Sequence, residues 1–211
     1  MMRIESVAAQ PDRAGRYTVK FEDGTVMRLY RQTVEDFGLY AGKVMADDEL
    51  SQLHTAAGQM SAKMRAVRIV SASSVSKADL ERRLVEKGES KKDAQQAVAW
   101  MSDLDLLDDR KTAEQVVSRC IAKGYGLARA KQALYEKRIP KAYWEDALAD
   151  YPDQTEKIVA FLQTKLGDRW DQQDLRRATD ALLRRGHSYQ EIRNALRELP
   201  QSVDLQEDIY G

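Results

Sequence analysis

The fold is decided by the stretch LVEKGESKKDAQQAVAW, from Leu84 to Trp100, because its pattern occurs again twice further along the chain. Its opening residues, Leu84–Gly88, match Leu134–Arg138 and Leu182–Gly186, and the closing residues of successive copies are 50 and 48 residues apart. Each copy continues with a residue that starts helices and then with a small residue followed by an aliphatic one. Self-similarity at a period of this size is typical of an array of supersecondary units. We therefore predict three copies of one helical module over roughly the last two-thirds of the chain.

Start and stop signals divide the first copy into three helices. Ser76 and Ser90 each stand three residues before an aspartate, which is a helix-capping pattern, and Gly88 is a typical C-terminal stop. Apolar residues recur at helical spacing between these signals. We expect the helices at about 61–72, 76–87 and 91–102.

The other two copies carry related signals. The second opens at Thr112 and has Pro140 where its third helix should start, a position for which proline is pre-organised. The third has a cap near Asp171 and ends with the capping pattern Ser188-x-x-Glu191. The predicted modules are residues 61–110, 111–154 and 155–211, and the last of them includes an acidic tail from Glu198 with Asp204, Glu207 and Asp208.

Residues 1–60 differ from the rest. Arg16–Phe21 and Thr25–Tyr30 alternate apolar and polar residues on either side of an Asp-Gly turn, which predicts a β-hairpin. Residues 4–7 could add a third short strand. Thr33 is expected to cap a short helix over 37–42, and another helix should begin at Asp47. The predicted fold is mostly α: an elongated array of three tandem three-helix modules preceded by a small N-terminal segment with a β-hairpin and short helices.

Composition limits the function classes. The 211 residues include 34 basic and 34 acidic side chains, and this balance argues against a nucleic-acid binder that works by bulk attraction. The chain has neither an apolar run long enough to cross a membrane nor a signal-peptide core at its start. The single cysteine, Cys120, cannot form an internal disulfide and fits a reducing compartment. We expect a cytoplasmic protein that does not contact membranes.

Positive charge is concentrated in the second module. Between Gln115 and Trp144, seven basic residues stand against one acidic residue, Glu136. These seven are the predicted contacts to a partner or to nucleic acid: Arg119, Lys123, Arg129, Lys131, Lys137, Arg138 and Lys141. The alternative is that they are the solvated faces of amphipathic helices. A second candidate cluster in the third module is diluted by aspartates: Arg176, Arg177, Arg184 and Arg185.

The sequence offers no constellation for catalysis, and we predict no cofactor. Asp108 and Asp109 have no matching His or Cys, so they are interpreted as a helix cap rather than a metal site. His54 and His187 have no partners at ligand or triad spacing. Cys120 lies in an apolar helical row and is expected to be buried. The tryptophans Trp100 and Trp144 could stack on bases, but their positions in third helices favour the module cores.

Several motifs around the second module resemble the RecX regulators of the RecA recombinase. They comprise the run LDLLDDRKTA from Leu104 to Ala113, followed by Arg119, by Lys123-Gly-Tyr-Gly-Leu and by Leu134-x-x-Lys-Arg-Ile-Pro. The N-terminal part is similar too, with Phe-Glu-Asp-Gly and Phe37-Gly-Leu-x-x-Gly42. The resemblance covers essentially the whole chain. Arg138 departs from the family pattern, which usually has glycine there, so the turn must close with a non-glycine residue.

This resemblance implies a non-enzymatic inhibitor. Such proteins bind the filament that RecA forms on single-stranded DNA and suppress its ATP hydrolysis, its strand exchange and its co-protease activity in the SOS response. We expect RecA as the partner and a monomeric protein, and direct contact with single- or double-stranded DNA stays open. Two alternatives stay open at this point: a helix-turn-helix-like DNA-binding regulator, and a helical-repeat scaffold for another partner.

Overall fold

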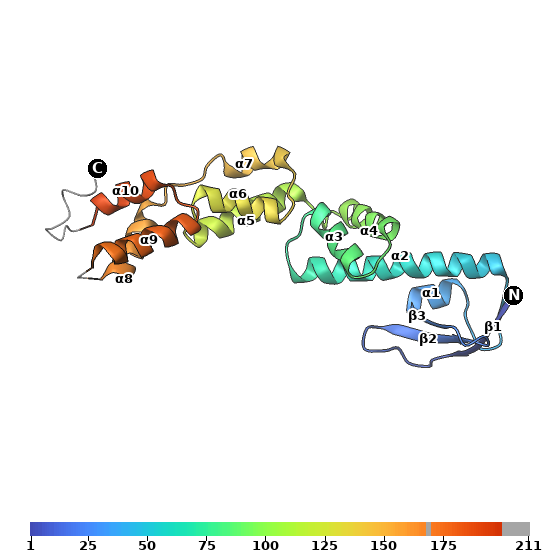
Figure 1. Cartoon of the computed structure of the whole chain (residues 1–211). Coiled ribbons are helices and arrows are strands. Elements are labelled where there is room, and N and C mark those ends of the chain that lie inside the picture. Colours follow the sequence, from blue (N-terminus) through green and yellow to red (C-terminus); the bar gives the residue numbers. More distant parts are fainter. Residues whose placement is uncertain (168–169, 200–211) are drawn as a thin grey trace. The chain divides into compact units, whose positions relative to one another are not determined.

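A computed structural model describes residues 1–167 and 170–199. The chain is mostly helical, with a small antiparallel sheet near its N-terminus, and this confirms the predicted fold class (Figure 1). It divides into two compact units, residues 1–108 and 109–211, which are described in turn. The predicted acidic tail falls almost entirely on residues 200–211, outside the described residues.

The first unit begins with a four-stranded sheet in the order β3-β2-β1-β4, in which every neighbouring pair is antiparallel. The hairpin of β2 (Arg16–Phe21) and β3 (Val26–Tyr30) is confirmed, and residues 4–7 belong to β1 (Met2–Val7). β4 (Val44–Met45) was not expected from the sequence. Alternation places Val19 and Phe21 in the core and leaves Lys20, between them, exposed.

The prediction for residues 33–42 was wrong. The short helix α1 spans Arg31–Asp36, so Thr33 lies inside it and is buried rather than capping a later helix. Residues 37–42 form turns instead. Gly38 and Gly42 have φ angles of +53° and +95°, a left-handed backbone that interrupts a right-handed helix.

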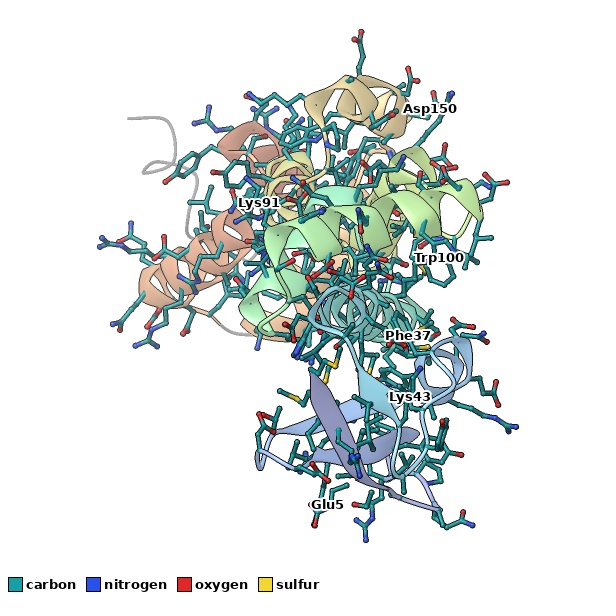
Figure 2. The ribbon with its side chains drawn as sticks, turned by 90° about the vertical axis from the view of Figure 1, so that its right-hand side faces the viewer. Glu5, Phe37, Lys43, Lys91, Trp100 and Asp150 are labelled. Carbon is teal, nitrogen blue, oxygen red and sulfur yellow. The ribbon has the colours of Figure 1, made fainter. Side chains whose placement is uncertain are left out.

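The helix α2 (Asp47–Ala72) begins at the predicted Asp47 but continues without a break to the end of the segment expected as 61–72. Its N-terminal half places Leu53 in the core of the sheet, and its C-terminal half places Ala62 and Ala66 in the next core. In Figure 2, Lys43 lies beside Phe37 close to this helix; its Nζ donates to the carbonyl oxygen of Phe37 and lies 2.7 Å from Oε1 of Glu49. The helix α2 therefore contributes buried residues to two hydrophobic cores.

Two further helices complete the first unit: α3 (Lys77–Glu86) and α4 (Lys91–Asp103), close to their predicted ranges. The hydroxyls of Ser76 and Ser90 each accept a bond from the backbone N–H three residues on, as predicted. The helices α2 and α4 approach so closely that a Cβ atom on Gly58 would stand 2.8 Å from Oδ2 of Asp93. Leu80, Leu84, Ala94, Ala97 and Met101 fill the core between the three helices.

The second unit contains two helical modules. The first has α5 (Asp109–Ala122), α6 (Leu127–Glu136), the 3₁₀ turn η1 (Lys141–Tyr143) and α7 (Trp144–Leu148). The second has α8 (Thr155–Leu166), α9 (Gln172–Arg184) and α10 (Tyr189–Arg197). The helix α5 begins three residues before the predicted Thr112, which is buried within it. Pro140 precedes a 3₁₀ turn rather than a continuous third helix. The module limits that the sequence suggested stay predictions.

The three sequence copies end in the same turn. Leu84, Leu134 and Leu182 are fully buried, and their carbonyl oxygens accept the N–H of Glu89, Ile139 and His187 at 3.1, 3.0 and 3.2 Å. This bond from the residue five positions on defines the Schellman motif that closes many helices. The residue before each donor has positive φ: 93° at Gly88, 54° at Arg138 and 88° at Gly186. The sequence repeat is thus a structural repeat.

Candidate functional site

The seven basic residues singled out in the second module all lie between the end of α5 and the start of η1. Arg119 lies in the last turn of α5 and Lys123 just after it, Arg129 and Lys131 lie on α6, Lys137 and Arg138 lie in its closing turn, and Lys141 begins η1. Arg119, Lys123, Lys131, Arg138 and Lys141 are exposed, whereas Arg129 and Lys137 are half-buried. The structure gathers these charges on one module, and their role as contacts stays a prediction.

One of the seven charges is engaged within its own helix. Nη1 of Arg129 lies 2.9 Å from Oε1 of Glu136, the single acidic residue of this stretch. The hydrogen bond from Arg129, together with one from Gln132, lowers the pKa of the Glu136 carboxyl, and the same pair raises the pKa of the Arg129 guanidinium. The Arg129 side chain is 36% exposed and that of Glu136 50% exposed, so solvent screens the pair and it adds little to stability. It does cancel the only negative charge among these basic residues.

The four arginines of the secondary cluster do not share one environment. Arg177 lies 3.7 Å from Asp174. Arg176 lines an open groove of about 790 Å³ together with Asp171 and Asp180. Arg184, in the last turn of α9, is exposed. The Arg185 guanidinium packs over the ring of Phe161, 4.8 Å from its centroid, and near Tyr125 at 5.8 Å. Arg185 is therefore part of the packing of the second unit.

Backbone contacts join the two modules of the second unit at Gly126 and Gly186. The N–H of Gly126 donates to the carbonyl oxygen of Arg185 at 2.9 Å, and the N–H of Ala128 donates to that of Gly186 at 3.3 Å. A Cβ atom on Gly126 would stand 2.0 Å from the Gly186 oxygen, and one on Gly186 would stand 2.2 Å from the backbone nitrogen of Arg129. Glycine is the residue that permits so close an approach of two backbones.

Side chains reinforce this junction. Nε2 of the buried His187 lies 3.0 Å from the carbonyl oxygen of Gly124, so this ring nitrogen carries the proton and donates it. The hydroxyl of Tyr151 donates to the carbonyl oxygen of Tyr125 at 2.6 Å, and burial raises the pKa of Tyr151 to about 12. Nζ of Lys157 donates to the carbonyl oxygen of Ile121. These bonds occupy backbone oxygens around the turn between α5 and α6.

The described residues hold no group of three or more His, Cys, Asp or Glu side chains that could bind a metal ion. Cys120 is buried as predicted, and burial raises the pKa of its thiol, which disfavours the reactive thiolate. Among residues 1–167 and 170–199, no helix is both long and apolar enough to span a bilayer. The exposed charges are therefore the better candidates for function than any buried polar group.

Comparisons with known proteins point to one family. The family described as "RecX, second three-helix domain" matches residues 108–148. The regulatory protein RecX of Vibrio parahaemolyticus is 28% identical over 140 residues, which cover 65% of this chain and 90% of that protein. The regulatory protein RecX of Clostridium acetobutylicum is 22% identical over 205 residues, 93% of this chain and 95% of that one. The chain is therefore similar to RecX proteins, over nearly its whole length in the second case.

Two solved RecX structures share the fold. The crystal structure of a regulatory protein RecX superposes with a TM-score of 0.62 at 19% identity and covers 94% of this chain and 100% of its own. The crystal structure of RecX from Lactobacillus salivarius gives a TM-score of 0.58 at 24% identity over 68% of this chain and 97% of its own. The fold of this chain is thus shared with a solved RecX structure over nearly its whole length.

The departure at Arg138 is accommodated in this chain without loss of the turn. Its φ of 54° places a long, charged residue where the other two copies have glycine. The bonds of the motif are nevertheless present, from Arg138 N–H to the oxygen of Tyr135 at 2.8 Å and from Ile139 N–H to that of Leu134 at 3.0 Å. The turn therefore keeps its shape and gains a positive side chain at an exposed position.

The tryptophans and the junction residues show what the sequence could and could not indicate. Trp100 and Trp144 pack partly buried against their module cores, and Nε1 of Trp144 donates to the oxygen of Ile139 at 3.0 Å. The role of His187 and the pairing of Gly126 with Gly186 were missed. Gly126 was visible in Lys123-Gly-Tyr-Gly, but the sequence near it does not indicate which residue it contacts.

Proposed function

We propose that this protein is a negative regulator of the RecA recombinase that binds the RecA filament on single-stranded DNA. Binding inhibits ATP hydrolysis, strand exchange and co-protease activity, and thereby modulates DNA repair and the SOS response. The proposal rests on similarity to RecX proteins, and the relatives compared above are named regulatory proteins. The protein acts in the cytoplasm as a monomer, by binding rather than by catalysis and without a cofactor.

The proposed mechanism is inferred from the exposed positive charge of the second module. Between residues 115 and 144, seven basic side chains lie on or next to α5, α6 and η1, and the one carboxylate of this stretch, Glu136, is paired with Arg129. Such a surface attracts a negatively charged partner, either the DNA backbone or acidic side chains of the filament. Further modules on the same chain let several weak contacts act at high effective concentration.

The ATPase rate of RecA on single-stranded DNA, titrated with this protein, tests the proposal. We expect inhibition well below one protein per RecA subunit, since a regulator that caps or disassembles filaments acts on many subunits. An unchanged ATPase rate at equimolar protein contradicts the proposal. Tight, sequence-dependent binding to duplex DNA with a steep salt dependence would instead identify a DNA-binding regulator. Binding to neither would leave a scaffold for another partner.

A further inference from the structure

One side of α6 carries apolar and basic residues that the module core does not use. Leu127, Lys131 and Tyr135 are spaced four residues apart, so they form a row along one face of the helix, which we name the α6 strip. Tyr135 is 68% exposed and Leu127 38% exposed, and Lys131 is also exposed. The buried residues of α6 are Ala130 and Leu134, on the side of the helix that Leu127 borders and from which Lys131 and Tyr135 turn away. Folding of the module does not account for an aromatic residue left this far in solvent.

The α6 strip differs from the residues at the same positions of the repeat on α3 and α9. The residues of α9 at the same positions are Leu175, Thr179 and Leu183, and both leucines pack against the core of their own module. On α3 the middle position is Glu81, whose carboxylate accepts a hydrogen bond from Gln95 of α4 at 3.1 Å. This face is thus used for packing in the module of α9 and partly for a polar contact in the module of α3, where Val85, the counterpart of Tyr135, is 42% exposed. In the module of α6 it presents an aliphatic, a cationic and an aromatic side chain to solvent.

The surroundings of the strip are positive. Lys141 begins η1 in the position that Tyr189 has in α10, and Arg138 follows the strip in the closing turn. Among the described residues, no carboxylate pairs with Lys131 or Lys141, and Glu136 is held by Arg129. A partner of the strip must therefore be acidic and must also cover an apolar patch. An exposed tyrosine is one of the residue types that most often dominate the binding energy of protein interfaces, so Tyr135 is the candidate anchor of the strip.

We propose that the α6 strip is the anchor of a docking surface for an acidic protein surface, with Tyr135 as its central contact. This inference rests on the proposed function, in which the partner is the RecA filament, and it assigns the contact to protein rather than to DNA. Single-stranded DNA is bound by several aromatic residues that stack successive bases along a groove. The strip has one aromatic residue, on the convex surface of a helix, between an aliphatic side chain and a lysine.

Two tyrosines make a matched test possible, because Tyr135 and Tyr189 are both 68% exposed on helices of the same unit. The variants Tyr135→Ala and Lys131→Glu are compared with Tyr189→Ala and Lys92→Glu in the full chain. Affinity is measured for RecA filaments assembled on a single-stranded oligonucleotide with a slowly hydrolysed ATP analogue, and for the oligonucleotide alone. Circular dichroism confirms that each variant folds. Exposed side chains of this kind can be removed with little effect on stability.

We expect Tyr135→Ala and Lys131→Glu each to weaken filament binding about tenfold, and the two control variants to change it less than about twofold. Equal effects at Tyr135 and Tyr189 overturn the inference and leave the proposed function standing. An equal loss of affinity for the oligonucleotide alone also overturns it, because the strip would then be a nucleic-acid site. If the unaltered protein fails to bind the filament, the proposed function and this inference fall together.

Discussion

Gly126 lies directly against Gly186, with its N–H bonded to the oxygen of the preceding Arg185 at 2.9 Å and no room for a Cβ atom on either glycine. We predict that Gly126→Ala destabilises the second unit by about 2 kcal/mol, because the added methyl group forces the two backbones apart. Gly167→Ala is the control, since its Cβ would meet nothing within 4 Å and only its φ of +62° is unfavourable. Thermal unfolding of both variants measures the difference. Equal midpoints would show that the junction is not tightly packed.

The turn at Arg138 gives a second prediction. A non-glycine residue at φ 54° is strained by about 1 kcal/mol, so Arg138→Gly should increase the free energy of unfolding by up to that amount. Gly88→Ala, at φ 93° with open space around its Cβ, should lower it by a similar amount. Urea unfolding measures both changes. A loss of stability in Arg138→Gly would mean that contacts of the arginine side chain outweigh the backbone strain.

Tyr151 predicts a dependence of stability on alkaline pH. Burial raises its pKa from 10.0 to about 12, so between these values the unfolded chain has lost the phenolic proton and the folded chain still holds it. Stability is therefore fully present below pH 10 and falls as the pH rises toward 12. In Tyr151→Phe this contribution disappears, and stability at pH 8 is lower by about 1 kcal/mol because the bond to Tyr125 is lost. The thermal midpoints of the two proteins should converge as the pH rises from 10 toward 12, and a difference that stays constant over this range would contradict the assignment.

The repeat was predictable because it depends on local chemistry. A buried leucine, a residue with positive φ four positions later and a capping residue two positions after that specify a Schellman turn and a new helix from a few neighbouring residues. This made Leu84, Leu134 and Leu182 recognisable in advance, and the structure confirms that all three are buried in the same turn. The hairpin of β2 and β3 was predictable for the same reason, since Asp-Gly determines its turn.

The features that were missed depend on residues far apart in the sequence. Nothing near Gly126 indicates that Gly186 lies against it, because the contact joins positions 60 residues apart. The continuity of α2 was also hidden, since its central residues from Thr55 to Gln59 are small or polar and resemble a linker. Within the helix, Gly58 faces the Asp93 side chain of α4, a contact between residues 35 positions apart that the local sequence does not indicate. Charge in the second module was visible in composition, but the pairing of Arg129 with Glu136 was not.

The structure also decides which basic residues can serve as controls for a charge-reversal experiment. Arg82 and Arg83 both pair with the Asp79 carboxylate, at 2.6 and 2.9 Å, and the Asp79 side chain is only 2% exposed. Reversing these two arginines would leave a buried carboxylate among like charges, which is strongly destabilising. We predict that Arg82→Glu with Arg83→Glu lowers the thermal midpoint of the protein by several degrees, whereas Lys91→Glu with Lys92→Glu, at two exposed positions, changes it little. Equal thermal midpoints of the two double variants would show that the ion pairs of Asp79 with Arg82 and Arg83 do not stabilise α3.

A charge-reversal test of the second module should therefore use lysines alone. Lys123, Lys131 and Lys141 are exposed, and so are Lys87, Lys91 and Lys92 of the first unit, which gives two triple variants with the same change of net charge. If the second module makes the proposed contact, reversal of its three lysines to Glu should raise the concentration needed to inhibit the RecA ATPase by tenfold or more, because each reversal replaces attraction by repulsion. The control variant should change it less than about threefold, through the altered net charge alone. Added salt should reduce the difference between the variants, since exposed charges are screened. Equal effects of the two triple variants would remove the second module from the contact and leave net charge as the cause.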